Sequence, residues 1–198
     1  MEPIILASGS LQRQEYFRLL DLPFNIMPPA IDESYDENCE PQKIVEDIAT
    51  RKVSRIVELL GDRTPPWICG ADTIVCVDKR ILGKPSDRED ARNMLNMLQG
   101  REHEVITAVA LCRGWDGHIL CRSVTSAVSF TQLSEREIEW YLDTGEWQGA
   151  AGAYKIQGLA GCYISCIKGS YSGIVGLPLH ELYAMLRASG YPYGDSIV

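Results

Sequence analysis

The sequence predicts an α/β fold with a mixed, twisted sheet and flanking helices. Short apolar runs typical of buried strands alternate with segments of helical periodicity, and this alternation indicates stacked layers of sheet and helix. Residues 103–112 and 118–130 predict two strands around a turn at 113–117. This embedded hairpin adds antiparallel pairing, so the sheet is expected to be mixed. With no repeat or obvious linker, we expect a single domain over 1–198.

The N-terminal region predicts a strand, a small-residue turn and a helix. Residues 4–7 are apolar, Ser8-Gly9-Ser10 follows, and residues 11–20 have a helical pattern with Ser10 as the N-cap. Free backbone N–H groups and the helix dipole both point at such a turn. The turn is therefore a candidate anion site.

Residues 41–60 predict a long helix that ends at Gly61, after an acidic loop at 32–40. Its apolar stripe includes Ile44, Ile48 and Ile56, and Lys52 falls on the same line. A lysine there either extends along the edge of the stripe toward water or is a cation directed into a site.

Residues 67–77 predict a buried strand with Asp72 in its middle. A carboxylate among apolar residues is costly unless it is paired or metal-bound. Asp72 is therefore either a satisfied structural carboxylate or a base or metal ligand. Asp78-Lys79-Arg80 predicts a tight turn into a short return strand at 81–82.

The rest of the chain continues the alternation. Ser86-x-x-Glu89 and Ser134-x-x-Glu137 predict capping boxes for helices that run to about 98 and 143. Lys84 lies between Gly83 and Pro85, either as an ordinary surface lysine or as a cation with a fixed direction. The remaining predictions are a Gly/Ala-rich segment at 149–161, a strand at 162–168, a loop at 169–176 and a helix at 179–189.

Composition restricts the function classes. Acidic residues outnumber basic ones 27 to 19, for a net charge of −8, which disfavours a nucleic-acid polymer as partner. No apolar run approaches the roughly 20 residues of a membrane helix, and the N-terminus has no signal-peptide pattern, so we expect a cytoplasmic protein. The seven cysteines and three histidines form no zinc pattern, and the thiols are expected to be reduced and buried.

Common phosphate-binding and serine-hydrolase motifs are absent, including G-x-x-x-x-G-K-[ST], G-x-G-x-x-G and G-x-S-x-G. What remains is a set of two carboxylates, three cations and a small-residue turn. Phosphoryl chemistry needs this combination, because cations and a metal offset phosphate charge while a carboxylate orients or deprotonates water. The set comprises Ser8, Ser10, Arg13, Glu33, Lys52, Asp72 and Lys84.

Six segments follow one another along the chain: LASGSLQRQEYFRLL from Leu6, GADTIV from Gly70, GKP from Gly83, AGAYKIQGLAG from Ala151, GSY from Gly169 and VGLPL from Val175. In these segments, and in their order, the chain resembles the Maf family of nucleotide pyrophosphatases. The resemblance implies a two-lobed fold with a central cleft, like that of inosine-triphosphate pyrophosphatases. It also implies cleavage of a nucleoside triphosphate to the monophosphate and pyrophosphate with a divalent cation (Mg or Mn), a house-cleaning role and a homodimer.

The resemblance also implies roles for individual residues. Asp72 corresponds to the general base, and Glu33 to an acidic residue near the metal, which makes Asp72 and Glu33 the implied metal ligands. Ser8, Ser10 and Arg13 correspond to the phosphate-binding turn and its helix. Lys52 and Lys84 correspond to cations that face the triphosphate.

Substrate choice is implied by other positions. Thr73 and Gln157 resemble the branch that prefers dTTP and UTP, and their side chains offer hydrogen bonds to a base edge. The chain departs from this branch at Gln12, where the branch has arginine, and around Ala150 and Lys155, where one cation is lost and another gained. Arginine to glutamine removes a fixed charge and a bidentate donor, so Gln12 bears on specificity.

Two alternatives belong to other classes. The changed positions Gln12 and Ala150 would also suit a nucleotide-binding regulator with little turnover. The family's link to arrest of cell division suggests a protein-interaction module, although no exposed amphipathic docking segment stands out.

Overall fold

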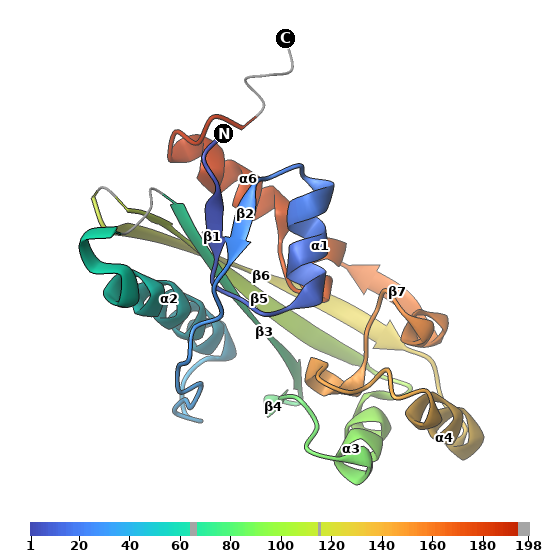
Figure 1. Ribbon diagram of the computed structural model, residues 1–198. Coiled ribbons are helices and arrows are strands. Elements are labelled where there is room, and N and C mark those ends of the chain that lie inside the picture. Colours follow the sequence, from blue (N-terminus) through green and yellow to red (C-terminus); the bar gives the residue numbers. More distant parts are fainter. Residues whose placement is uncertain (64–66, 115, 194–198) are drawn as a thin grey trace. The chain divides into compact units, whose positions relative to one another are not determined.

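The computed structural model describes residues 1–63, 67–114 and 116–193. Trp115, part of the predicted turn at 113–117, lies outside the described residues. Figure 1 shows the elements in chain order. They are β1 (Ile4–Leu6), α1 (Leu11–Leu19), β2 (Phe24–Ile26), α2 (Pro41–Leu60), η1 (Gly61–Arg63), β3 (Trp67–Val77), β4 (Arg80–Leu82), α3 (Arg88–Leu98), β5 (Glu102–Arg113), β6 (His118–Phe130), α4 (Glu135–Asp143), η2 (Ala151–Ala153), η3 (Leu159–Tyr163), β7 (Ile164–Lys168), α5 (Tyr171–Val175) and α6 (Leu179–Ala188).

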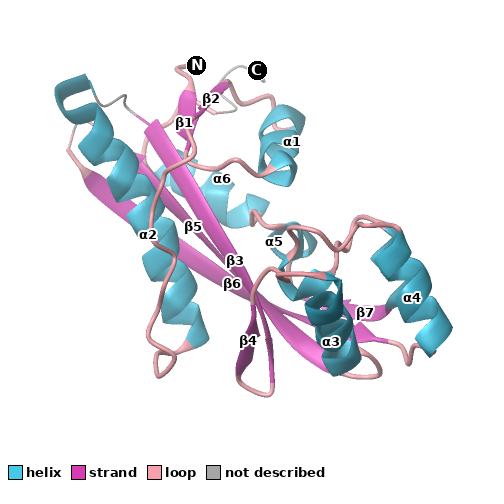
Figure 2. Cartoon of the chain, turned by 60° about the horizontal axis from the view of Figure 1, so that its bottom comes forward, coloured by secondary structure: helices cyan, strands magenta, loops and turns pink. Residues whose placement is uncertain are grey.

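The strands form one mixed sheet with flanking helices, as predicted (Figure 2). Its order is β2-β1-β3-β5-β6-β7, and β4 pairs with β3 off this path. β1 pairs in parallel with β2 and β3, whereas the β3–β4 and β6–β7 pairs are antiparallel. β1 therefore lies between two parallel neighbours, and its carboxyl end leads directly into the turn at 8–10.

The chain divides into two compact units. Unit 1 comprises Met1–Asp72, Thr107–Ser123 and Gly176–Val198, and unit 2 comprises Thr73–Ile106 and Val124–Val175. Each unit has its own hydrophobic core. The core of unit 1 includes residues of β1, α1, β3, β5 and α6, and that of unit 2 includes residues of β3, α3, β6 and α4. The predicted cleft between two lobes and the single domain over 1–198 stay predictions.

Within unit 1, helices cover both faces of the strands: α2 lies on one side, with α1 and α6 on the other (Figures 1 and 2). Side chains alternate between faces along a strand. Cys69 and Ala71 of β3 pack in the core with α1 and α6. Gly70 is directed at α2, because a Cβ there would meet Val53. Asp72, two residues further, shares the face of Gly70.

Several local signals are confirmed. Ser10 caps α1 by accepting from the Arg13 N–H, and Ser134 forms the full capping box with Glu137. α2 spans the predicted range and ends at Gly61, whose φ of 52° suits glycine. Asp78 and Lys79 also have positive φ and form the two-residue turn between β3 and β4.

One predicted cap is wrong. The N-cap of α3 is Asp87, which accepts from the Asp90 N–H at 2.8 Å, rather than Ser86 with Glu89. The N–H of Ser86 instead donates to the Asp90 carboxylate at 2.9 Å. An aspartate one residue later competes successfully for the cap because its carboxylate accepts a charge-assisted hydrogen bond.

Other differences concern short elements and thiols. β2 was not predicted, and α5 occupies the expected loop at 169–176. All seven cysteines are free thiols as expected, but not all are buried, because Cys39, Cys162 and Cys166 are exposed.

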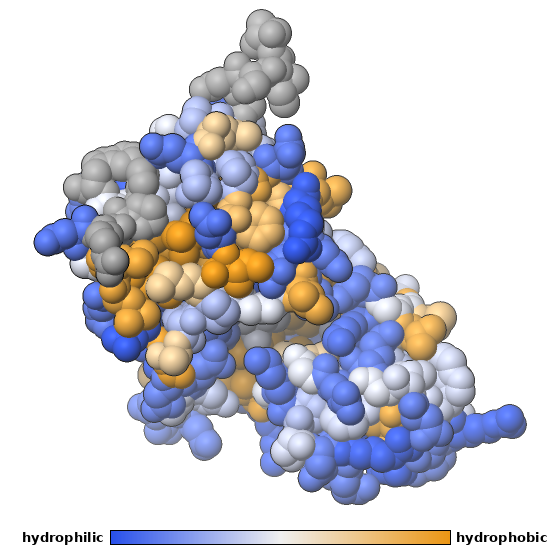
Figure 3. All heavy atoms as spheres, viewed as in Figure 1, coloured by the Kyte–Doolittle hydropathy of each residue, from blue (hydrophilic) through white to orange (hydrophobic). Residues whose placement is uncertain are grey.

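The surface over α3 and α4 is mostly hydrophilic (Figure 3). Ion pairs join these helices, since Arg88 contacts Glu139 and Asp143 at 2.8 and 2.7 Å. Among the described helices, none combines the length and the apolar character needed to cross a bilayer.

Candidate functional site in unit 1

The turn at 8–10 presents hydroxyl and N–H groups at the start of α1. Ser8, 6% exposed, accepts from the Ser10 N–H at 3.2 Å. Ser10 is the N-cap, and its hydroxyl donates to Oε1 of Gln12 at 3.2 Å. The first turn of α1 therefore has an ordered N-terminus, where backbone N–H groups and the helix dipole favour an anion.

Hydrogen bonds to Ser8 and Gly176 help to hold Arg13 in place. Its Nη1 donates to Ser8 Oγ at 3.1 Å, and its Nε donates to the Gly176 carbonyl at 2.8 Å. Burial of the guanidinium lowers the pKa of Arg13, and the nearby Asp72 carboxylate opposes that change most strongly. Arginine remains charged under such shifts, so the turn carries a fixed cation with one orientation.

Lys52 and two carboxylates form the centre of the site. Lys52 Nζ lies 2.7 Å from Asp72 Oδ1 and 2.8 Å from Glu33 Oε1. Lys52 and Asp72 are each 8% exposed, whereas the Glu33 side chain is 49% exposed. The buried ammonium thus lies between a buried carboxylate on β3 and a half-exposed one on the preceding loop. Lys52 therefore does not extend along the edge of the stripe toward water but points at the two carboxylates, and its role as a cation of a functional site stays a prediction.

Close packing of α2 on β3 makes this pair possible. At Gly70 an added Cβ would lie 2.8 Å from Val53 Cγ2 and 3.1 Å from the Ala49 carbonyl oxygen. Only glycine allows the helix so near the strand at this level. The approach places Lys52 opposite Asp72, which lies one strand repeat beyond Gly70.

The charges of the unit 1 site balance. Arg13 and Lys52 are cations, and Asp72 and Glu33 are anions; the pKa of Arg13 responds to both carboxylates. A triphosphate would add several negative charges to this neutral set. The site therefore needs further positive charge to hold such a ligand.

The two carboxylates suit a divalent cation whose remaining coordination positions are filled by a bound ligand. Within 1–63, 67–114 and 116–193, no group of three or more His, Cys, Asp or Glu side chains is placed to hold a metal. Asp72 and Glu33 nevertheless converge on one cation, the Lys52 ammonium. Mg²⁺ is usually held by one or two carboxylates together with substrate phosphates and waters. The donor set therefore fits such an ion.

The other predicted residues belong to unit 2. Lys84 and Gln157 are exposed, and Thr73 is half-buried on β3. Inside this unit the GKP turn meets the AGAY segment, since the Gly152 N–H donates to the Gly83 carbonyl at 3.0 Å. The structure thus brings the turn of Lys84 close to η2. Assembly of Lys84, Thr73 and Gln157 with the unit 1 residues stays a prediction.

Gln157 lies on a segment that is held within unit 2. Glu146 accepts from the Tyr141 hydroxyl at 3.1 Å and from the Leu159 N–H at 2.9 Å. Its carboxylate also accepts from the Ala160 N–H at 3.3 Å. One carboxylate therefore fixes the chain immediately after Gln157.

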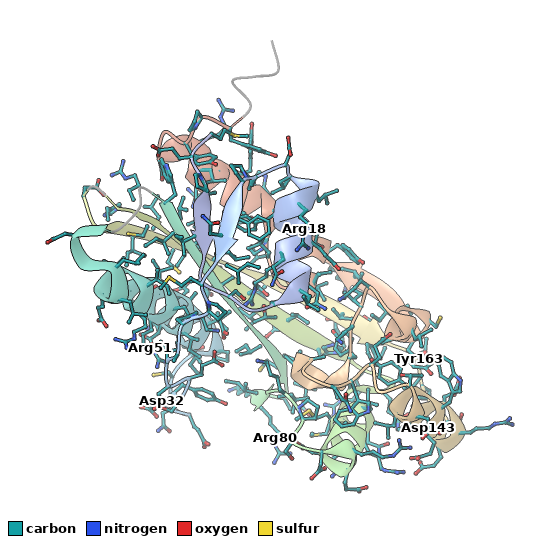
Figure 4. The ribbon with its side chains drawn as sticks, in the orientation of Figure 1. Arg18, Asp32, Arg51, Arg80, Asp143 and Tyr163 are labelled. Atoms are coloured by element: carbon teal, nitrogen blue, oxygen red, sulfur yellow. The ribbon has the colours of Figure 1, made fainter. Side chains whose placement is uncertain are left out.

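Sequence reasoning missed three contributors to the site. The Gly176 carbonyl orients Arg13, Gly70 permits the approach of α2, and Arg51 contacts the loop of Glu33. Gly70 and Gly176 both lie in quoted motifs, but a motif letter does not reveal which backbone atom or missing Cβ matters. Figure 4 shows the side chains around α2 and its preceding loop.

Comparisons with known proteins agree on the family. The family model described as Maf-like protein matches residues 3–189. A dTTP/UTP pyrophosphatase of Symbiobacterium thermophilum is 46% identical over 193 residues, which cover 97% of this chain and 96% of that protein. A dTTP/UTP pyrophosphatase of Desulforamulus reducens is 41% identical over 190 residues, which cover 96% of this chain and 98% of that protein.

A nucleoside triphosphate pyrophosphatase of Anaplasma phagocytophilum is 41% identical over 192 residues, with 96% of both chains covered. Among solved structures, the Ham1 protein of Staphylococcus aureus matches with a TM-score of 0.41 and 14% identity over 65% of this chain and 72% of that one. That likeness is too distant to carry an argument. The family match and the full-length relatives show that this chain belongs to the Maf family.

Proposed function

We propose that this protein is a nucleoside triphosphate pyrophosphatase that hydrolyses dTTP and UTP between the α- and β-phosphates. The carrying observation is the buried Lys52 ammonium between the carboxylates of Asp72 and Glu33, in the same unit as the anion site before α1. Phosphoryl transfer depends on positioned cations and a carboxylate that handles water. The names of the full-length relatives support the same activity.

Asp72 is the proposed general base. Its carboxylate accepts a proton from water as the water oxygen bonds to phosphorus, and the anhydride bond then breaks. The products are the nucleoside monophosphate and pyrophosphate. Lys52 fixes one carboxylate oxygen at 2.7 Å, so the base has a defined orientation before substrate binds.

The phosphates bind to the turn before α1 and to nearby cations. Both contacts of Ser8 Oγ use the oxygen as acceptor. As far as the described residues go, the hydroxyl proton of Ser8 is therefore available to donate to a phosphate oxygen. Arg13 and Lys52 offset the phosphate charge in unit 1, and Lys84 is proposed to add a third cation from unit 2.

A divalent cation, Mg²⁺ or Mn²⁺, completes the proposed site. Asp72 and Glu33 would hold it, because their oxygens converge and leave the remaining positions to phosphates and water. When bound, such an ion supplies charge neutralisation and activates water.

We assign the choice of base to Thr73 and Gln157, whose polar side chains would pair with a pyrimidine edge. Polar pockets reject bases that leave their groups unpaired. Gln12 also stays a proposed specificity residue, and its Oε1 accepts from the Ser10 hydroxyl at 3.2 Å. It therefore stabilises the N-cap, while Arg13 supplies the charge.

The test is pyrophosphate release from a panel of nucleoside triphosphates with Mn²⁺, Mg²⁺ or chelator. We expect metal-dependent turnover of dTTP and UTP. Asp72→Asn should lower kcat by roughly 10²–10⁴-fold, because the base is lost. Asp143→Asn is the matched control, an exposed carboxylate paired with Arg88. Normal turnover by Asp72→Asn would remove this residue from the mechanism.

The alternative is a nucleotide-binding regulator, favoured by the altered Gln12 position. It predicts thermal stabilisation by dTTP without pyrophosphate release. We further propose a homodimer that acts in the cytoplasm on free nucleotides and not on nucleic-acid polymers. Gel filtration tests the dimer.

A further inference from the structure

We propose that Arg51 is a positioning residue that holds the loop of Glu33, so that the Glu33 carboxylate reaches Lys52. The inference deepens the proposed function, on which its kinetic consequence rests. Arg51 lies on α2, and Figure 4 shows it beside Asp32 of the preceding loop.

The guanidinium of Arg51 bridges the two peptide carbonyls that flank Glu33. Its Nη1 donates to the Asp32 carbonyl at 2.5 Å, and its Nη2 donates to the Ser34 carbonyl at 3.0 Å. One rigid, planar group thus grips the backbone on both sides of the residue. The Oε1 of Glu33 then lies 2.8 Å from the Nζ of Lys52, the residue that follows Arg51 on α2.

The third nitrogen of this side chain fixes Arg51 itself. Its Nε lies 2.7 Å from Asp47 Oδ2, one helical turn earlier. Consecutive residues on a helix point about 100° apart, so Arg51 and Lys52 approach the loop from two directions. α2 therefore holds this part of the loop at two places, the backbone carbonyls of the loop and the carboxylate of Glu33.

Within the described part of the chain, the loop itself is held mainly by local hydrogen bonds. Residues 32–40 are exposed, and the hydrogen bonds inside this range span two or three residues. The Asp32 carboxylate accepts from the N–H and hydroxyl of Ser34 at 2.9 and 2.7 Å, which shapes the turn around Glu33. Such a local turn sets the conformation of the segment but does not attach it to α2. Arg51 and Glu33 both attach it to the helix.

A lysine cannot replace this function completely. A guanidinium presents donors in a fixed fork that reaches two carbonyls and a carboxylate at once, whereas an ammonium is a single point. Arg51→Lys should retain one contact, and Arg51→Met should retain none while keeping good helix propensity.

The first arm measures backbone amide order parameters by NMR relaxation in the metal-free protein, which needs no catalysis. We expect Arg51→Met to lower the order parameters of residues 31–36 from about 0.85, the value of rigid backbone, to below about 0.6, because the segment is no longer attached to α2. Arg51→Lys should give an intermediate decrease. The matched control is Arg55→Met on the same helix, whose guanidinium pairs with Glu58 of α2, and its loop should stay as ordered as in the wild type.

The second arm is a kinetic double-mutant cycle with Glu33→Gln, measured as pyrophosphate release from dTTP. Removing an outer partner of a metal-binding side chain costs roughly 10–100-fold in metal affinity or activity. Arg51→Met should therefore lower kcat/KM by about tenfold in the wild-type background, but by less than about twofold when Glu33 is already glutamine.

Unchanged order parameters in the loop of Arg51→Met would overturn the proposal, as would an equal kinetic loss in both backgrounds. A wild-type protein that releases no pyrophosphate would instead contradict the proposed function. In that event the relaxation arm alone still decides whether Arg51 holds the loop.

Discussion

Replacing Gly70 by alanine tests whether close packing of α2 on β3 builds the site. The new Cβ would lie 2.8 Å from Val53 Cγ2, 3.1 Å from the Ala49 carbonyl oxygen and 3.4 Å from Lys52 Cβ. The valine methyl can rotate away, but the carbonyl is helix backbone. The helix must therefore move by a few tenths of an ångström, and Lys52 moves with it.

The magnitude follows from two opposing effects. Overpacking a close-packed interior costs about 1–3 kcal/mol. Glycine to alanine within a strand returns about 0.5–1 kcal/mol of backbone entropy. The net loss is about 1–2 kcal/mol, which corresponds to a Tm lower by about 2–8 °C for a chain of this size. Turnover should also fall, because the displaced Lys52 no longer meets Asp72 at its present distance of 2.7 Å.

A cycle with Val53→Ala separates this steric contact from other effects. Val53 is fully buried, so its truncation alone should cost about 2–3 kcal/mol. In the double variant the smaller side chain makes room for the new methyl. Denaturant unfolding should then show a combined loss at least about 1 kcal/mol smaller than the sum of the single losses. Strict additivity, or a Gly70→Ala protein as stable and active as the wild type, would refute the reasoning.

Three further predictions concern charge, pH and specificity. Arg13→Lys keeps the charge but loses the two-point anchor, so KM for dTTP should rise roughly tenfold in steady-state assays, and an unchanged KM would contradict the anchor. Burial lowers the pKa of His103 from 6.5 to about 4, so the unfolded chain binds the proton first as pH falls. The stability that neutral His103 contributes is therefore present above pH 6.5 and is lost between pH 6.5 and 4. Urea unfolding should show this loss as a decrease of about 3 kcal/mol in the free energy of unfolding. In His103→Leu the free energy of unfolding should change less with pH over this range. In Gly158→Ala the new Cβ would meet the Glu146 carboxylate at 2.3 to 2.5 Å. The segment of Gln157 should therefore shift, and discrimination between dTTP and dATP should weaken. An unchanged ratio of the two kcat/KM values would count against this.

Local signals predicted most of the longer elements. α2 begins at Pro41 and ends at Gly61 because proline suits the first helical position and glycine suits the terminal positive φ. The capping box at Ser134 was predicted from spacing alone. By contrast, Ser86 and Asp87 are both good caps, and only the geometry of the turn before α3 decided between them.

Short elements escaped prediction because their stability is not local. β2 is three residues long, and its pattern of one half-buried and two exposed residues carries no strand signal. It exists because β1 offers it backbone partners, from Ile4 with Phe24 to Leu6 with Ile26. α5 likewise spans five residues, too few for a helical period to be recognised.

The sequence by itself determined which side chains are candidates for a site. A small-residue turn between strand and helix, an aspartate inside an apolar strand and a lysine on an apolar stripe each depend on side-chain period or local turn chemistry, which neighbouring residues set. Only the tertiary structure decided that Lys52 pairs with both Asp72 and Glu33, and that Arg51 grips the loop. Those contacts join elements about 20 residues apart. The contact between Lys52 and Asp72 depends on how closely α2 packs on β3, where the missing side chain of Gly70 sets the distance.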